Sequence, residues 1–528
     1  MPFRTGFGFA ANALNPSTPS SDEERVGVRS LVTLSLAVAF AVRVGVTWGP
    51  HVVDPWRLKL AGLFARARSW SALLAVLALP SASALSPPSA DAAPHSGIQV
   101  RRGGPDAQLK FRTTRPGEAF LDMSVAARRV SWAEPGHESA VVSLFVDGHY
   151  VTDVVISSNR PTPREFALGS LSAGVHTLRI HYAAHRSPSR AGAASLRHLH
   201  VHTISKNNPQ YAAARYAPVL YGRDVPSLGG PFQSAVTDSP LVAWHEITPA
   251  EKSGHSVIEY SVVWSNEDGG TDTPGLMARW GRSTDIEWVY RVEVNRAGHR
   301  VRGSGVYQAA GHQTLRFRGR YDGTHPLLET CTSNNNMCDT VDDPMRLALS
   351  TREVRPVEQP REYLMDTHPW TYTVMAQEML REGKIETPSD PATPAVGDQR
   401  SYLYVAVDHD TTPAASEAGV GLAVDVRLAG DPTTYSSDHQ IPGWSVNRDV
   451  PAATTVELPV GTTAADVVSM SVRRVPIGLT DNGATLTVTD INRAFLLGPD
   501  YLPQAPFVSW HGSQQLTAAS PTAVLWSS

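Results

Sequence analysis

The chain has 528 residues, of which 18% are charged and 41% are hydrophobic. This composition excludes an intrinsically disordered chain, and the length allows about three domains of roughly 100–200 residues each once a leader is removed. The net charge is −4 and no block of basic residues occurs, so the electrostatic signature of a nucleic-acid-binding protein is missing. We therefore expect a folded multi-domain protein that has no nucleic acid among its partners.

Residues 1–92 are predicted to form a leader. Two arginines precede the apolar run from Trp70 to Leu79, and the small residues Ala82 to Ala84 follow it, which is the pattern of a secretory signal peptide. The pattern lies well inside the chain, so either the start codon is placed too early or the earlier apolar run, Ser30 to Val46, is an unusual anchor. Two membrane helices are the alternative, although both runs fall short of the roughly 20 residues that span a bilayer. We expect a secreted, extracellular protein with no transmembrane anchor after processing.

Short strand-like runs separated by glycine or proline fill residues 97–205. Asp147-Gly148 between two of these runs predicts a two-residue β-hairpin. The order of a strand, a Val-Asp-Gly hairpin, a second strand and then LSAGVHTLRI resembles the jelly-roll carbohydrate-binding modules of secreted polysaccharide-active proteins. The resemblance covers about a fifth of the chain and implies a two-sheet sandwich that binds sugar.

Residues 211–354 form a second β-rich block, which holds the predicted functional residues. The segment YAPVLYG and the later acidic strand resemble the vacuolar-sorting and necrosis-inducing β-sandwich families. Those families carry His-Asp-Trp-Glu, whereas this chain has Asp-Ile-Glu-Trp at 285–288 without a preceding histidine. No metal or catalytic role is therefore carried over from them.

The remaining sequence predicts one short helix and a third sandwich. Residues 355–398 contain a helix that begins after Asp366 to Pro369 and ends at Gly383, and then a Pro-rich linker. Strand-like runs return over 400–503, where Asp481 to Gly483 predicts another hairpin turn, and 504–528 is expected to be a tail. The predicted fold class is all-β, with tandem jelly-roll-like β-sandwiches and a short helix before the last module.

Carboxylates in the central block are the candidate catalytic residues: Asp285, Glu287 and Glu259. Glycoside hydrolysis needs two carboxyl groups about 5–10 Å apart, one of them held protonated. Asp285 and Glu287 are two residues apart and share one face of a strand. The alternative is a solvated strand face with Arg–Glu cross-strand pairs. The candidate substrate-binding residues are the aromatic and basic side chains nearby: Trp264, Trp280, Trp288, Arg279 and Arg282.

His198, His200 and His202 alternate along a predicted strand and should share one face. Three histidines can hold zinc, but three alternate positions on a strand span about 13 Å, so one ion would reach two of them and hardly the third. A histidine pair completed by a distant ligand remains open. We favour an exposed polar face on the last strand of the sandwich.

Cys331 and Cys338 are the two cysteines of the chain, and export would favour a disulfide between them. The alternatives are free thiols or metal ligands. The oxygen-rich residues Asn336, Asp339 and Asp342 nearby would suit a structural Ca²⁺ ion, although loops are rich in Asn and Asp for conformational reasons alone. No cofactor is required by any motif.

Nucleotide-binding loops, zinc-protease motifs and nucleophile elbows are absent from the sequence. Two functions of different classes remain. The first is binding of an extracellular or cell-surface polysaccharide by the sandwich faces. The alternative is a glycoside hydrolase with its carboxylate pair in the central block. A concave central pocket with two carboxylates and a tryptophan would favour the enzyme.

Overall fold

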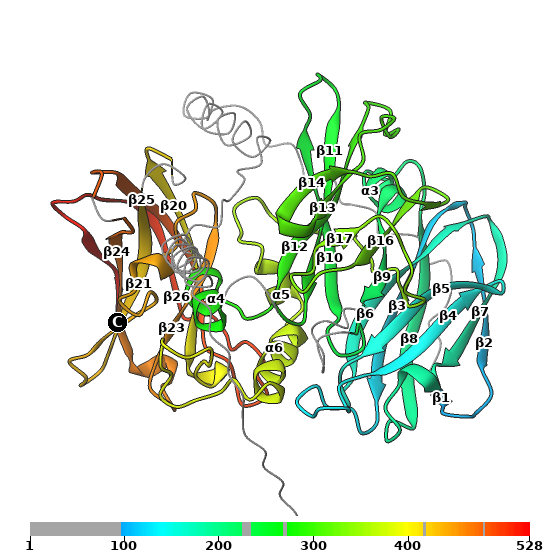
Figure 1. Ribbon diagram of the computed structural model, residues 1–528, viewed down its shortest axis with the longest axis horizontal. Coiled ribbons are helices and arrows are strands. Elements are labelled where there is room, and N and C mark those ends of the chain that lie inside the picture. The colour runs from blue at the N-terminus through cyan, green and yellow to red at the C-terminus, as the bar shows by residue number, and fades with distance from the viewer. Residues whose placement is uncertain (1–96, 224–233, 268–271, 415–418, 479–480) are drawn as a thin grey trace, which may run out of the picture. The chain divides into compact units, whose positions relative to one another are not determined.

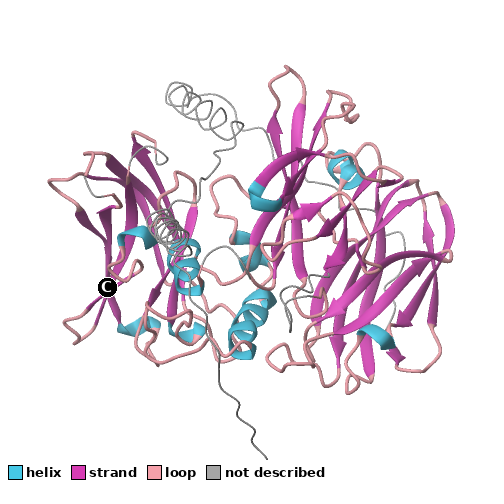
Figure 2. Cartoon of the chain, viewed as in Figure 1, coloured by secondary structure: helices cyan, strands magenta, loops and turns pink. Residues whose placement is uncertain are grey.

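A computed structural model describes residues 97–223, 234–267, 272–414, 419–478 and 481–528. The predicted leader, 1–92, lies outside these residues. Within the described part, six antiparallel or mixed sheets pair into sandwiches, and helices are few (Figures 1 and 2). None of the helices in this part is both long and apolar enough to cross a membrane. The all-β fold class predicted from the sequence is confirmed.

The N-terminal sandwich pairs a sheet of order β1-β8-β3-β6 with a sheet of order β2-β7-β4-β5. Its strands are β1 Ile98–Arg101, β2 Ala107–Thr113, β3 Gly117–Ala127, β4 Ala140–Val146, β5 His149–Ile156, β6 Thr162–Leu171, β7 Gly174–Tyr182 and β8 Ala193–Ile204. Buried and half-exposed residues alternate along β7, so one face points into the core. Asp147 and Gly148 join β4 to β5 with φ values of 51° and 85°, which a two-residue hairpin of this type requires. This predicted hairpin is confirmed.

The central block also contains two sheets, of order β14-β13-β12-β11-β10-β19 and β15-β16-β9-β18, with β17 paired to β16. The strands are β9 Val219–Arg223, β10 Pro240–Pro249, β11 Ser256–Trp264, β12 Ile286–Val294, β13 Val306–Ala309, β14 Gln313–Arg316, β15 Tyr321–Asp322, β16 His325–Thr330, β17 Met337–Cys338, β18 Arg346–Leu347 and β19 Glu353–Val354. Two of the pairings, β10 with β19 and β16 with β9, are parallel. Segments far apart in the sequence therefore meet within each sheet.

Helices are more numerous than the single one expected. The described residues form α3 Tyr211–Tyr216, α4 Thr273–Trp280, α5 Tyr363–Thr367 and α6 Trp370–Arg381. The helix α6 matches the predicted one, but α3 and α4 lie in the block that was expected to be β-rich. Pro274 in the first turn of α4 and Gly281 with a φ of 66° at its end are helix start and stop signals that outweigh the short apolar pattern. Arg279 and Trp280 therefore project from a helix.

The segment after α6 is tied to its surroundings. The backbone N–H of Glu386 donates to Val396 O at 3.0 Å, and the Ser389 hydroxyl donates to the Glu457 carboxylate. The predicted Pro-rich linker is thus a loop held by hydrogen bonds at both ends.

The C-terminal sandwich pairs sheets of order β23-β20-β25-β26 and β22-β21-β24-β27. Its strands are β20 Tyr402–Thr412, β21 Val420–Leu428, β22 Thr434–Ser436, β23 Ala452–Glu457, β24 Val467–Pro476, β25 Thr485–Phe495, β26 Val508–Leu516 and β27 Thr522–Ser527. The hairpin predicted at Asp481 to Gly483 is wrong, because the flanking strands β24 and β25 belong to opposite sheets. The last two strands complete both sheets, so the sandwich continues past the expected limit at 503.

Short 3-10 helices occur in the loops, at Ala184–Arg186, Ala310–His312, Gln399–Ser401, Pro442–Trp444 and Ala464–Asp466. One hydrophobic core runs from the N-terminal sandwich through the central block and α6, and includes the fully buried Trp132, Trp244 and Trp264. A second core fills the C-terminal sandwich.

Candidate functional site

The predicted carboxylate pair stands at the start of β12. Asp285 immediately precedes the strand and is 1% exposed, whereas the Glu287 side chain is 17% exposed. Burial raises the pKa of both carboxyl groups, and the charge of Glu287 raises the pKa of Asp285 further. The two groups therefore hold protons to a higher pH than carboxyl groups in water do.

The Asp285 carboxyl is enclosed by a polar network. Asn335 donates from Nδ2 to Asp285 Oδ2 at 2.9 Å and to Asn266 O at 3.1 Å. The Asn335 Oδ1 accepts from Arg223 at 2.6 Å, and Arg223 also pairs with the buried Asp238 at 2.6 Å. Because these partners surround it, the Asp285 carboxyl does not face solvent.

Glu287 contacts the more open part of the site. Gln308 Nε2 donates to Glu287 Oε2 at 2.8 Å, and His312 Nδ1 lies 3.5 Å from Glu287 Oε1. His312 Nε2 is 3.1 Å from Asn334 Nδ2, and the imidazole is about half exposed. Gln308 and His312 carry no sequence signal for this site, and the sequence marks Asn334 and Asn335 only as members of an oxygen-rich loop. The pairing of β12 with β13 and the path of the 331–338 loop bring all four here.

The predicted disulfide between Cys331 and Cys338 is confirmed. It closes the loop that holds Asn334 and Asn335 beside the carboxylate pair, and Cys331 N donates to Asn336 O at 3.0 Å inside it. Of the three residues proposed for calcium, Asp339 has a protein partner, because its Oδ2 accepts from Arg318 N at 2.7 Å, and Asn336 is buried. Asp339 and Asp342 are not among the acidic and histidine side chains that converge on one point in the described residues.

Glu259 lies in a cross-strand ion pair. Its carboxylate accepts from Arg291 Nε at 2.5 Å, directly opposite on β12, and lies 3.5 Å from Arg361. The register places Val262, not Glu259, opposite Glu287. Of the candidate catalytic residues, the structure thus brings Asp285 and Glu287 together and pairs Glu259 with arginine.

The three candidate tryptophans, all within the described residues, are buried or half-buried. Trp264 is 0% exposed and belongs to the core, so its ring has no free face for a sugar, which corrects the expectation for this residue. Trp288 is buried, with the Arg291 guanidinium 3.9 Å from its ring centroid. Trp280 is half-buried, and Arg448 lies 3.9 Å from its centroid.

The candidate arginine Arg282 is bound through its side chain, and Arg279 is bound through its backbone. Arg282 is buried and donates from Nε to Glu362 Oε1 at 2.9 Å. Arg279 is half-buried on α4, and its carbonyl accepts from Arg448 Nη1 at 2.5 Å. A pocket of about 430 Å³ lies elsewhere, on the C-terminal sandwich beside Arg427 and Asp431, and contains none of the predicted catalytic residues.

A second polar surface lies on the outer face of the sheet β2-β7-β4-β5. Gln108, Arg179, Phe145 and Tyr150 are successive cross-strand partners over four strands. The Arg179 guanidinium stacks 3.6 Å from the Phe145 ring centroid. We call the surface formed by Asp106, Phe145, Tyr150, Arg179 and His181 the Arg179 face. The alternation of polar residues in HTLRIHY was the sequence signal for it.

Hydrogen bonds fix the polar groups of the Arg179 face. Asp106 accepts from Arg179 Nη1 at 2.7 Å through one carboxylate oxygen and pairs with His181 Nδ1 at 2.7 Å through the other. All three side chains remain partly exposed. They therefore present donors and acceptors to solvent in a fixed arrangement.

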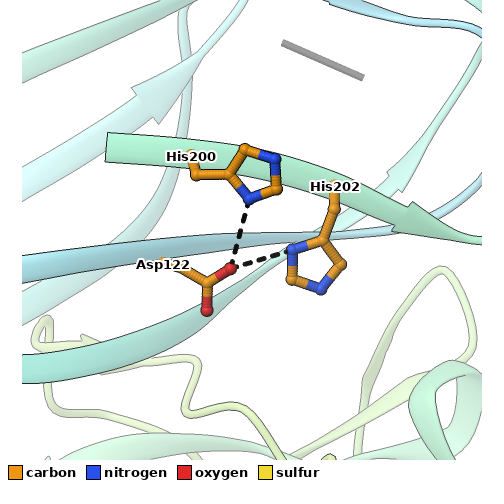
Figure 3. Close-up of side chains that lie close together, drawn as sticks. All are labelled: Asp122, His200 and His202. Atoms are coloured by element: carbon orange, nitrogen blue, oxygen red, sulfur yellow. Dashed lines mark hydrogen bonds and ion pairs between the residues drawn. The ribbon is translucent and has the colours of Figure 1, made fainter. Parts of the chain in front are cut away.

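The three histidines of β8 differ from the expected exposed row. A bulge at His198, where φ is 54°, shifts the register between β3 and β8. His198 is exposed, but His202 is 3% exposed and its ring stacks on Phe120. His200 and His202 point toward Asp122 of β3 (Figure 3).

No protein-family model matches the chain, and no curated protein matches it either. Solved structures give distant matches over about a fifth to a quarter of the chain, to carbohydrate-binding modules and carbohydrate-active enzymes. The carbohydrate-binding module of the Cellvibrio mixtus lichenase 5A, in complex with cellotriose, is 13% identical over 22% of this chain and 95% of that one, with a TM-score of 0.15.

Two further matches are similar in extent. The EclA C-terminal domain, a sugar-binding protein, is 16% identical over 24% of this chain and 89% of that one, with a TM-score of 0.15. A family two carbohydrate esterase from Clostridium thermocellum is 17% identical over 21% of this chain, with a TM-score of 0.14. The match spans 29% of the esterase chain.

Proposed function

We propose that this protein binds an extracellular or cell-surface polysaccharide through the Arg179 face. The observation that carries the proposal is the cross-strand row of Gln108, Arg179, Phe145 and Tyr150 on an outward face of a β-sheet. Sugar-binding surfaces need a few fixed polar groups beside an aromatic or planar group. This row supplies both.

The chemistry of the face suits hydroxyl groups. A sugar hydroxyl both donates and accepts, Arg179 offers only donors, and the Asp106 carboxylate only accepts. Because Asp106 already holds Arg179 and His181 in place, little side-chain entropy is lost when a ligand binds. The guanidinium plane over Phe145 gives a flat surface against which a sugar ring can lie.

Retention on insoluble polysaccharides and titration with soluble ones test the proposal. Arg179→Ala and His181→Ala should each weaken binding about tenfold, the equivalent of about 1.4 kcal/mol. His511→Ala is the matched control, because His511 also pairs with an aspartate, Asp490, at 2.7 Å but on the C-terminal sandwich. No retention of the wild type on any polymer, or equal retention of all variants, would overturn the proposal.

Hydrolysis of a glycan at Glu287 is the second candidate, favoured by the raised pKa values of Glu287 and Asp285. A carboxyl group whose pKa is raised can act as the general acid of glycoside cleavage, and Glu287 is the member of the pair that reaches the more open part of the site. Reducing-sugar release that Glu287→Gln abolishes and Glu259→Gln preserves would establish it. No release from any polymer by the wild type would reject it.

Export through the signal segment completes the proposal. Its support is the arginine-flanked apolar run Trp70 to Leu79 followed by small residues. The first residue of the protein recovered from culture medium tests it, and a mature chain that begins between residues 85 and 93 is the expected result. An unprocessed chain retained in cells would contradict export.

A further inference from the structure

Asp122, His200 and His202 converge on one point at the outer face of the sheet β1-β8-β3-β6 (Figure 3). One donor atom from each residue lies within 4.8 Å of the others. Asp122 Oδ2 is 3.1 Å from His202 Nδ1 and 3.5 Å from His200 Nδ1. Two ring nitrogens therefore face the same carboxylate oxygen.

The strand pairing explains this convergence. Asp122 of β3 stands directly opposite His200 of β8, and Phe120 stands opposite His202. Directly opposite residues on one face of an antiparallel pair have Cβ atoms about 4.5–5.5 Å apart. The bulge at His198 absorbs one residue, so His200 and His202 share the face of Asp122 while His198 turns to solvent.

The separations fit metal ligands better than optimised hydrogen bonds. Elsewhere in the chain, His181 pairs with Asp106 and His511 pairs with Asp490 at 2.7 Å. The two distances at Asp122 are longer, 3.1 and 3.5 Å. Ligands bound to zinc at about 2.0–2.1 Å in a tetrahedron are about 3.3 Å from one another. The observed distances bracket this value.

Packing holds the His202 ring, and a second carboxylate lies beside it. His202 is buried against Phe120 with an interplanar angle of 17°, and its Nε2 lies 3.4 Å from Glu165 Oε1. Glu165 in turn accepts from Arg352 at 2.5 Å. The Glu165 carboxylate therefore places a second negative charge beside His202.

The chemistry of the donors selects the class of metal. Imidazole nitrogens suit Zn²⁺ and its neighbours among the transition metals, whereas Ca²⁺ and Mg²⁺ take oxygen ligands. Three protein ligands leave a fourth position of a tetrahedral ion free. The Asp122 side chain is 44% exposed and that of His200 is 28% exposed, so this position faces solvent.

We propose that Asp122, His200 and His202 form a binding site for a divalent transition metal ion of the zinc class, with one coordination position open to water or an external ligand. The site lies on the sheet of the N-terminal sandwich opposite the one that carries the Arg179 face. It is independent of glycan binding and of the carboxylate pair in the central block.

Zn²⁺ titration of the full chain tests the site, without a polyhistidine tag and after metal removal, with a chromophoric chelator as competitor. One Zn²⁺ per chain is expected for the wild type. Asp122→Asn and His200→Gln should each weaken binding at least about tenfold. Both ligands are partly exposed, so these variants should fold, which circular dichroism checks. The matched control His511→Gln removes a histidine that is 87% exposed and paired with one aspartate, and should bind as the wild type does.

Co²⁺ provides a second readout, because its visible absorption reports a tetrahedral nitrogen–oxygen site. The spectrum should appear in the wild type and the His511→Gln control and be lost in His200→Gln. Absence of stoichiometric Zn²⁺ binding by the wild type would overturn the proposal. So would binding that Asp122→Asn and His200→Gln leave unchanged.

Discussion

Trp132 of the N-terminal sandwich donates its indole N–H to the carboxylate of Glu378 on α6, although 246 residues separate them in the chain. Glu378 is fully buried and also accepts from Arg381 Nη2. The guanidinium of Arg381 lies 5.3 Å from the Trp132 ring centroid and 3.5 Å from Glu138. A buried polar network thus joins the helix to the sandwich.

Removal of one partner from this network should lower the free energy of unfolding. Glu378→Ala would leave Arg381 buried without its nearest carboxylate, and we expect the free energy of unfolding to fall by about 3–5 kcal/mol. Guanidinium chloride unfolding measures it. Glu358→Ala, at an exposed glutamate, should change stability by less than about 0.5 kcal/mol. Equal effects of the two substitutions would contradict the structural role of Glu378.

Asp285 should make stability depend on pH. Burial raises its pKa in the folded state, so between the unfolded and folded pKa values the folded chain binds more protons than the unfolded chain. The free energy of unfolding therefore falls as pH rises through this range, by up to about 1.4 kcal/mol per pH unit. Asp285→Asn should make the free energy of unfolding, measured by denaturant at each pH from pH 4 upward, depend less on pH. Parallel profiles for wild type and variant would contradict it.

Loss of the Cys331–Cys338 bond should lower the stability of the fold and also alter the carboxylate site. The closed loop is short, so the double substitution Cys331→Ser and Cys338→Ser should cost about 2–3 kcal/mol by the chain-entropy relation. Because Asn335 in the loop holds Asp285, the pH dependence assigned to Asp285 should also change. Denaturant unfolding of the wild type, with and without reductant, and of the double variant checks the loss of stability. The same unfolding midpoint in all three measurements would refute it.

Gly281 and Gly383 offer a matched pair of substitutions. Both have a φ of 66°, but a Cβ on Gly281 would lie 2.9 Å from Ala453 and from Thr454 N, whereas one on Gly383 meets nothing within 4 Å. Gly383→Ala should cost about 1 kcal/mol for its backbone conformation alone, and Gly281→Ala should cost about 1–3 kcal/mol more. Thermal unfolding compares them. Equal losses of stability would mean that β23 moves away from the added methyl group at little cost in free energy.

Features with local causes were predictable from sequence. The hairpin at Asp147-Gly148 requires two positive φ values that this dipeptide tolerates, and α6 follows from an amphipathic run that stops before Gly383. The bond between Cys331 and Cys338, seven residues apart, was expected because export favours a disulfide. Each depends on residues that are close together in the chain.

Features that depend on strand register were not predictable. A single bulge at His198 decides which histidines meet Asp122, and nothing in β8 alone reveals its partner on β3. Trp264 could as well have been an exposed ring as a core residue until the sheet around it was known. The wrong prediction of a hairpin at Asp481 has a similar cause, because a turn motif does not reveal whether the next strand joins the same sheet.

The N-terminal sandwich presents different chemistry on the outer faces of its two sheets, with the hydrophobic core between them. A ligand on the Arg179 face and an ion at Asp122 would therefore not compete for space, and a ternary complex of protein, glycan and metal is sterically allowed. Any thermodynamic coupling between the two would have to pass through side chains packed as tightly as Leu121 and Leu144. Saturation with Zn²⁺ should accordingly leave the affinity for a glycan on the Arg179 face nearly constant.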